Sequence, residues 1–344
     1  MKQGKSIISV DPTEAQPPAA LEDAADAGPE AELRPFVIAA ADHGARLDRA
    51  LVALAPEFSR SYLQQLIEAG AVTLNSATVA RCAHKVRAGD QGTIELRPTP
   101  QSQSFRAEAM DLKVVFEDEH LLVIDKPAGL VVHPAPGNWS GTLLNGLLAR
   151  DAGAALLPRA GIVHRLDKDT SGLMVVARTR AVMDALVQRI AAREVARQYL
   201  ALAHRTWSGP ALRQVDAPIG RDPRNRLRMA VVESGKPSVT VFERLQDCAQ
   251  GCWVRATLQT GRTHQIRVHM AHIGHPLVAD ELYGGAPAAG LSRQALHAYR
   301  LAFEHPVGGR ALEFHAPLPA DLRQALALWG LRYNDSEWLT SHAP

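Results

Sequence analysis

A polar segment between two apolar runs, residues 161–172, has the composition expected of an enzyme site. It reads Gly-Ile-Val-His-Arg-Leu-Asp-Lys-Asp-Thr-Ser-Gly, and the apolar run Leu173–Ala177 follows it. Polar residues crowded between two buried strands usually form either a turn or an active site. Thr170-Ser171-Gly172 has turn chemistry, whereas Asp167 lies early in the loop, where its carboxylate could face a cleft. This carboxylate is the first candidate for a nucleophile or a base.

Two later segments have the same mixture of polar and aromatic side chains. One is Arg197-Gln198-Tyr199-Leu200-Ala201, and the other runs from Leu258 to Met270. In the second segment Gly261 permits a tight strand-to-helix turn, and Thr263 could cap the helix that follows. Arg262 stands just before that helix, so its guanidinium could reach into a cleft. Tyr199 and Arg262 therefore join Asp167 as candidate site residues.

Four motifs in this order resemble those of the RluA-type pseudouridine synthases. They are Asp125–Pro134, His164–Gly172, Arg197–Ala201 and Gly261–Arg267, and the likeness spans residues 40–335. At Arg197 this chain has arginine where the family usually has lysine. Pseudouridine formation breaks the N1–C1′ bond of a uridine, turns the uracil and rejoins it through C5. The resemblance therefore implies an isomerase that needs no cofactor and no metal.

The same resemblance implies a role for each candidate. Asp167 would be the catalytic carboxylate, held ionised by an ion pair with Arg262, and Tyr199 would stack on the flipped uracil near C5. Arg165 would enter the base stack and fill the space left by the target base. Lys126, before Pro127, either begins a turn or reaches the cleft. The substrate would be 23S ribosomal RNA in the large ribosomal subunit or its precursor, at uridines in helix 69 or at other large-subunit uridines.

Residues 35–97 predict a small α/β domain. Apolar residues recur at helical spacing from Leu47 to Leu54, and Ser59 can cap a second helix that ends at Gly70. Asn75-Ser76 between two alternating runs indicates a hairpin. The segments 46–48, 59–67 and 70–75 resemble the S4-type RNA-binding domain. The candidate RNA contacts in this domain are Arg46, Arg49, Arg60 and Lys85.

The remaining boundaries follow from composition. Residues 1–34 hold seven acids and three bases, a net charge of −4, and their few large apolar groups predict a disordered acidic tail. Residues 98–110 read as a linker, 111–335 as the catalytic domain and 336–344 as a C-terminal tail.

In the catalytic domain strands outnumber helices, so we expect an α+β fold with a mixed, largely antiparallel sheet. Strands are predicted over 112–116, 121–124, 161–164, 173–177, 199–203 and 254–258, and helices over 142–150, 179–193, 264–272 and 320–330.

Charge and composition narrow the kind of protein. Residues 189–228 contain nine arginines and three acids, a composition that suits RNA phosphates or a solvated basic surface. Three cysteines cannot build a disulfide framework, and no apolar run reaches the length of a membrane span. We therefore expect a cytoplasmic protein without a membrane partner, and we expect it to be a monomer.

Three rival interpretations make distinguishable predictions. The histidines 264, 269, 272 and 275 suggest a metal-dependent hydrolase, but no H-E-x-x-H motif accompanies them. His164-Arg165-Leu166-Asp167 resembles a kinase loop, but its Asp comes one place late and no glycine-rich loop precedes it. A non-catalytic RNA-binding or ribosome-assembly factor would be expected to lack at least one of Asp167, Tyr199 and Arg262.

Overall fold

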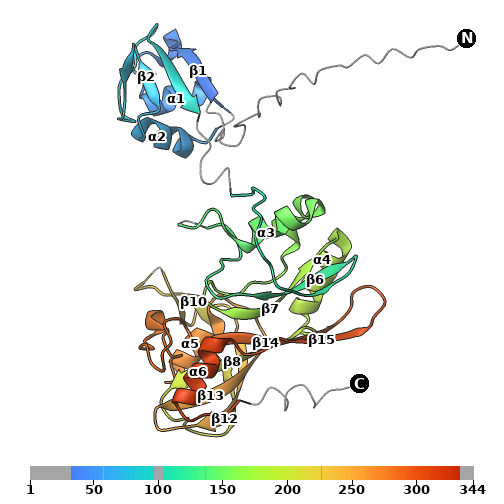
Figure 1. The fold of residues 1–344 in the computed structure, drawn as a ribbon. Helices are drawn as coiled ribbons and strands as arrows, with labels where there is room; N and C mark the ends of the chain where they lie inside the picture. Colours follow the sequence, from blue (N-terminus) through green and yellow to red (C-terminus); the bar gives the residue numbers. More distant parts are fainter. Residues whose placement is uncertain (1–31, 57, 97–103, 136, 226, 334–344) are drawn as a thin grey trace, which may run out of the picture. The chain divides into compact units, whose positions relative to one another are not determined.

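The computed structural model describes residues 32–56, 58–96, 104–135, 137–225 and 227–333. Those residues form two compact units, divided between Thr99 and Pro100 (Figure 1). The predicted N-terminal tail up to residue 31, the first half of the predicted linker and the predicted C-terminal tail lie outside the described residues. The predicted tail boundary at residue 34 is wrong, because strand β1 (Glu32–Val37) already begins at Glu32.

The first unit is a four-stranded antiparallel sheet packed on two helices. Its strand order is β1-β4-β2-β3, with β2 at Val72–Leu74, β3 at Ala77–Thr78 and β4 at Gln91–Leu96. The predicted helices are confirmed as α1 (Leu47–Leu54) and α2 (Arg60–Glu68), and the Ser59 hydroxyl caps α2 by accepting from the Tyr62 N–H. Asn75 and Ser76 have positive φ values, which close the predicted hairpin.

The second unit is built on a nine-stranded sheet in the described part of the chain. The pairings are antiparallel except for β7 with β14, which confirms the expected α+β class with a mixed, largely antiparallel sheet. The strand order is β5-β6-β7-β14-β8-β13-β12-β9, with β15 beside β14. The bounds are β5 Val114–Glu117, β6 Leu121–Lys126, β7 Ser171–Ala177, β8 Ala196–His204, β9 Leu212–Asp216, β12 Val239–Asp247, β13 Gly251–Leu258, β14 Leu296–Glu304 and β15 Ala311–His315.

Helices cover both faces of this sheet, because its inner strands alternate apolar residues toward each face. In β7, Met174 and Val176 pack in one cluster with α3 (Leu143–Arg150) and α5 (Gln265–His272), whereas Leu173 and Val175 pack in another with α4 (Arg180–Ala191). A third cluster joins α6 (Ala320–Leu328) to β8, β13 and β14. The predicted helices are confirmed as α3 Leu143–Arg150, α4 Arg180–Ala191, α5 Gln265–His272 and α6 Ala320–Leu328 (Figure 1). Short 3-10 helices lie at Ala40–Asp42 (η1), Ala152–Leu156 (η2), Pro158–Gly161 (η3) and Glu281–Tyr283 (η4), and β10 (Ile219–Arg221) pairs with β11 (Met229–Val231) as a separate hairpin.

Two sequence predictions fail in this unit. The expected strand over 161–164 is absent: η3 precedes it, and Ile162 makes a single isolated bridge to Val176. Consecutive positive φ values at Arg159, Ala160 and Gly161 turn the chain there, and a Cβ on Gly161 would lie 1.9 Å from the Ala177 carbonyl oxygen. The second half of the predicted linker is part of the domain, since Asn145 on α3 donates to the carbonyl oxygens of Ser104 and Arg106.

A close approach of β7 to β14 fixes the segment that carries Asp167. Gly172 has φ 114°, and a Cβ there would stand 2.2 Å from the Ala298 carbonyl oxygen on β14. No side chain fits at this point, so the glycine lets β7 begin directly beside the centre of the sheet. The loop of residues 164–170 is therefore held next to β8, which carries Tyr199.

Candidate active site

A cavity of about 580 Å³ lies between the loop before β7, strand β8 and the turn before α5. Asp167, Arg165, Tyr199 and Arg262 all line it, although they come from three separate segments of the sequence. The structure thus brings four of the residues predicted for the catalytic domain to one cavity. Lys126 does not line it.

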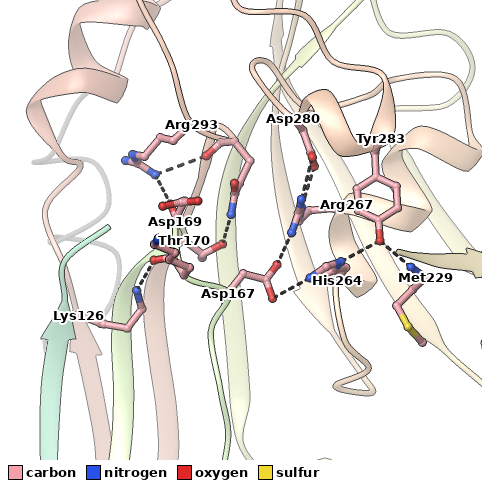
Figure 2. A network of polar contacts seen from close by, with 12 residues as sticks. Lys126, Asp167, Asp169, Thr170, Met229, His264, Arg267, Asp280, Tyr283 and Arg293 are labelled. Atoms are coloured by element: carbon pink, nitrogen blue, oxygen red, sulfur yellow. Dashed lines mark hydrogen bonds and ion pairs between the residues drawn. The ribbon is translucent and has the colours of Figure 1, made fainter. Parts of the chain in front are cut away.

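Asp167 is bound by a guanidinium in a half-buried position. Its side chain is 15% exposed, and Arg267 Nη1 lies 3.0 Å from its Oδ2. His264 Nε2 lies 3.8 Å from the other oxygen, Oδ1 (Figure 2). The Thr170 N–H donates to the Asp167 carbonyl oxygen, which closes the turn and directs the side chain. The ion pair with Arg267 and the turn at Thr170 together fix the position of the Asp167 carboxylate.

Arg267 is held from its other side by a second carboxylate. Its Nε and Nη2 each donate to Asp280 at 2.8 Å, and the Tyr283 ring centroid lies 5.0 Å from its Cζ. Burial lowers the pKa of Arg267, but the hydrogen bond to Asp280 and the charge of Asp167 outweigh burial and raise it above its usual range. The guanidinium is therefore a permanent charge with one orientation.

The predicted ion pair between Asp167 and Arg262 is wrong. Arg262 is exposed on the cavity wall, and its Nε donates to the Pro237 carbonyl oxygen at 3.3 Å. Thr263 does not cap α5 either. The N-cap is His264 with φ 57°, and the Gln265 side chain holds the turn by accepting from the Arg262 N–H. After this left-handed turn it is Arg267, in the first turn of α5, that pairs with Asp167.

Lys126 does not reach the cavity, so its predicted contact with RNA is wrong. Its side chain is 1% exposed, and its Nζ donates to the carbonyl oxygens of Pro127, Leu130 and Lys168 at 2.8–2.9 Å. Three acceptors satisfy the three donors of an ammonium group. Burial lowers the pKa of Lys126 to about 8, although the charges of Asp169 and Asp167 oppose that shift. Lys126 therefore ties the loop that carries Asp167 to the end of β6.

Tyr199 and His164 present uncharged rings near the cavity. Burial raises the pKa of Tyr199 to about 12, so its phenol stays protonated at neutral pH. Burial and the nearby charge of Arg197 lower the pKa of His164 to about 3. His164 Nε2 accepts from the Val175 N–H at 3.1 Å, which explains the histidine as a support for β7. Arg165 is exposed on the cavity wall, and its predicted role stays a prediction.

A chain of polar contacts continues from His264 away from the cavity (Figure 2). The Tyr283 hydroxyl lies 2.8 Å from His264 Nδ1 and accepts from the Met229 N–H at 3.0 Å. If the hydroxyl donates to Nδ1, the remaining proton of the neutral imidazole sits on Nε2 and faces the Asp167 carboxylate. Tyr283 thus contacts both neighbours of Asp167, His264 through its hydroxyl and Arg267 through its ring.

Tyr283→Phe is expected to lower the rate of any reaction that depends on Asp167 about tenfold, while changing the free energy of unfolding by about 1 kcal/mol. The substitution removes the hydrogen bonds to His264 and Met229 but keeps the ring beside Arg267. Initial rates and urea unfolding measure the two effects. A loss of activity that merely tracks the loss of folded protein would contradict this role for the hydroxyl.

Three of the four histidines that suggested a metal site, His264, His269 and His275, have other partners. His269 lies within hydrogen-bond distance of the Thr240 hydroxyl and the Ala217 carbonyl oxygen, and His275 stacks on Trp207. Among the described residues, no group of three or more His, Cys, Asp or Glu side chains is placed to hold a metal ion. The same described residues contain no helix long and apolar enough to cross a membrane.

Comparison with known proteins defines the class of this fold and site. Residues 120–272 match the family model for RNA pseudouridylate synthase, and residues 45–91 match the S4 domain. The human RNA Pseudouridylate Synthase Domain Containing 1 structure superposes with a TM-score of 0.52 at 27% identity, covering 67% of this chain and 94% of that one. The first matched segment contains all the residues that line the cavity except Leu296, and the second contains helices α1 and α2.

Curated relatives identify the family over most of the chain. Ribosomal large subunit pseudouridine synthase D of Neisseria meningitidis is 45% identical over 86% of this chain and 83% of its own length. The protein of the same name from Nitrosomonas europaea is 48% identical over 82% of this chain and 84% of its own length. The chain therefore belongs to the RNA pseudouridine synthase family, and it carries an S4 domain before the catalytic domain.

Proposed function

We propose that this enzyme converts uridine to pseudouridine in large-subunit ribosomal RNA, with Asp167 as its catalytic carboxylate. One observation carries the proposal: Asp167 is paired with Arg267 on the wall of a cavity that Tyr199 also lines. The names of the relatives, which are synthases of the ribosomal large subunit, support the choice of RNA. Helix 69 of 23S ribosomal RNA is the substrate we infer, and other large-subunit uridines are the alternative.

Each side chain of the cavity has a task in this reaction. The target uridine leaves its stack and enters the cavity, where Tyr199 packs on the uracil. Asp167, held in place by its ion pair with Arg267, acts on the nucleotide while the N1–C1′ bond breaks and the C5–C1′ bond forms. The proton on C5 then leaves, and N1 gains one proton. Substrate and product therefore contain the same atoms, and the reaction consumes no cofactor. Arg165 fills the space that the flipped base leaves.

We also infer where in the cell the enzyme acts and in which oligomeric state. Ribosomal RNA and its precursor lie in the cytoplasm of a bacterium, which is where we infer that the enzyme acts, as a monomer. A non-catalytic ribosome-assembly factor is the rival function. Asp167, Tyr199 and Arg267 around one cavity favour catalysis, because RNA binding alone needs no paired carboxylate among cations.

Release of tritium from ribosomal RNA labelled at C5 of uracil tests the reaction directly. Purified enzyme is expected to release tritium from unmodified large-subunit RNA, and mapping of the product locates the uridine. No release from any large-subunit RNA, with RNA binding intact, would favour the assembly factor. Release with modification outside helix 69 would retain the reaction and reject only the inferred substrate.

The S4 domain is proposed to hold the RNA through exposed arginines. Arg46 and Arg60 each pair with the fully buried Asp48 at 2.9 and 2.8 Å, and Lys85 Nζ donates to the Gly44 carbonyl oxygen. Hydrogen bonds from Arg46, with those from Arg60 and Gln64, hold the pKa of Asp48 well below its usual range despite burial. Arg49 is exposed beside Arg46 and Arg60, and no carboxylate of the described residues pairs with it.

Arg49→Ala is expected to weaken RNA binding severalfold and to reduce the slope of log affinity against log salt by about 1. The reason is that one phosphate contact, and the counterion it releases, is lost. Filter binding at several salt concentrations measures both quantities. Arg180→Ala, which removes an arginine paired with Asp184 on the exposed face of α4, is the matched control. An unchanged slope for Arg49→Ala would remove Arg49 from the RNA contact.

A further inference from the structure

Arg197 is a buried cation without a protein partner. It lies on β8, its residue is 5% exposed, and no acceptor among the described residues lies within hydrogen-bond distance of its Nε. The two Nη atoms of Arg197 likewise make no ion pair or hydrogen bond with a described residue. Arg267, on the same cavity wall, is instead bound by Asp167 and Asp280.

A guanidinium removed from water is costly unless an anion or acceptors replace the water. The neighbouring titratable groups do not supply that compensation. His164 and Tyr199 are neutral at pH 7, because burial lowers the pKa of His164 to about 3 and raises that of Tyr199 to about 12. Asp167 is the only acid among the residues that line the described cavity, and it is paired with Arg267. No acid that lines the described cavity is thus left to pair with Arg197, which favours an anionic ligand at this position.

The guanidinium of Arg197 is accessible to a ligand from the cavity. It lines the cavity wall and rests against Gly261, where a Cβ would stand 2.8 Å from Nη1. A glycine at this position leaves the fork uncovered by a side chain. Arg193 and Arg262 line the same wall from two other segments, and neither has a carboxylate partner among the described residues. Three arginines thus converge without an acid between them, which favours a multiply charged oxyanion.

We propose that Arg197 binds a backbone phosphate that flanks the nucleotide whose uracil enters the cavity. This inference rests on the proposed function, since it names the group that anchors the substrate there. Arg197 and Tyr199 are two residues apart on one face of β8, a separation of about 7 Å along a strand. A single nucleotide can therefore place its base on Tyr199 and its phosphate on Arg197. The bidentate fork of arginine matches two phosphate oxygens.

Neutralising single phosphates in a synthetic RNA tests this contact. We would use a hairpin with the sequence of helix 69, or another large-subunit fragment that the wild type modifies, with one methylphosphonate at each position in turn. One position next to the target uridine is expected to weaken wild-type binding roughly ten- to a hundredfold. In Arg197→Met the same position should cost nothing further, whereas methylphosphonates elsewhere keep their effects. Independent, additive losses at every position would overturn the proposal.

Two measurements without RNA distinguish this proposal from the proposed function. Arg197→Met is expected to unfold at the same temperature as the wild type or a higher one in chloride buffer, because it removes an unpaired buried charge. Replacing chloride by inorganic phosphate at equal ionic strength should raise the midpoint of the wild type more than that of Arg197→Met. Arg180→Met, with the same net charge, should respond like the wild type. Equal responses of wild type and Arg197→Met would reject the phosphate site, whether or not the enzyme makes pseudouridine.

Discussion

Asp167→Asn is expected to lower pseudouridine formation at least about 10³-fold while RNA affinity and stability stay close to those of the wild type. The amide keeps the size of the carboxylate but is neither a nucleophile nor a base. In this variant Arg267 keeps its ion pair with Asp280, so the buried guanidinium is not left without a carboxylate. Stability should therefore change by no more than about 1–2 kcal/mol. Tritium release, filter binding and urea unfolding measure the three quantities.

Asp169→Asn is the control for Asp167→Asn. Asp169 is two residues away in the same loop, and its described contact is made by the main-chain carbonyl oxygen, which accepts from Arg293. The Asp169→Asn variant should retain most of the wild-type activity. Loss of the folded state in Asp167→Asn would instead indicate that Asp167 serves the loop and not the reaction. Activity within tenfold of the wild type would reject Asp167 as the catalytic carboxylate.

Arg267→Gln is expected to be damaging in two separable ways. It leaves the carboxylates of Asp280 and Asp167 without their cation, and Asp280 has a side chain that is 1% exposed. Removing one partner of such a buried pair costs about 3–5 kcal/mol. The reaction should slow about 10²–10³-fold as well, because the charge that orients the Asp167 carboxylate is lost. Urea unfolding and tritium release at saturating RNA measure the two effects.

The double variant Arg267→Gln with Asp280→Asn separates stability from catalysis. It replaces a buried ion pair by two amides, so we expect part of the stability to return while the rate stays low. Arg262→Gln is the matched single control, since Arg262 is exposed and lies only five residues earlier. Its stability should change by about 0.5 kcal/mol or less. A larger loss of rate in Arg262→Gln than in Arg267→Gln would restore the ion pair that the sequence suggested.

Local chemistry made much of the fold readable from the sequence. Ser59 caps a helix and Asn75-Ser76 closes a hairpin, because these choices depend on neighbours a few residues away. The run at residues 161–164 was misread as a strand for the opposite reason. Its apolar pattern is that of a strand, but the turn at Arg159–Gly161 is imposed by the close approach to β7. Periodicity does not contain such a contact.

In the candidate site, too, some residues could be predicted from the sequence, whereas one decisive contact could not. The residues of the ordered motifs, with their polar loop between apolar strands, were sufficient to single out Asp167 and Tyr199 and to indicate the family. The sequence alone could not decide which guanidinium meets Asp167, since Arg262 and Arg267 stand in one motif. That choice depends on the left-handed turn at His264 and on Asp280, which clamps Arg267 from beyond α5.

For Lys126 and Arg197 the sequence does not show whether the protein itself supplies partners for the charge. As letters in the sequence, both are cations near a motif, and either could contact RNA. In the folded chain three carbonyl oxygens accept from the Lys126 ammonium group, whereas the buried Arg197 Nε has no acceptor among the described residues. Residue types and their order determined the chemistry that is present and the segments that carry it. Tertiary structure alone decided which charges are neutralised by the protein and which remain for a ligand, because that depends on distances between residues far apart in sequence, such as the 100 positions between Asp167 and Arg267.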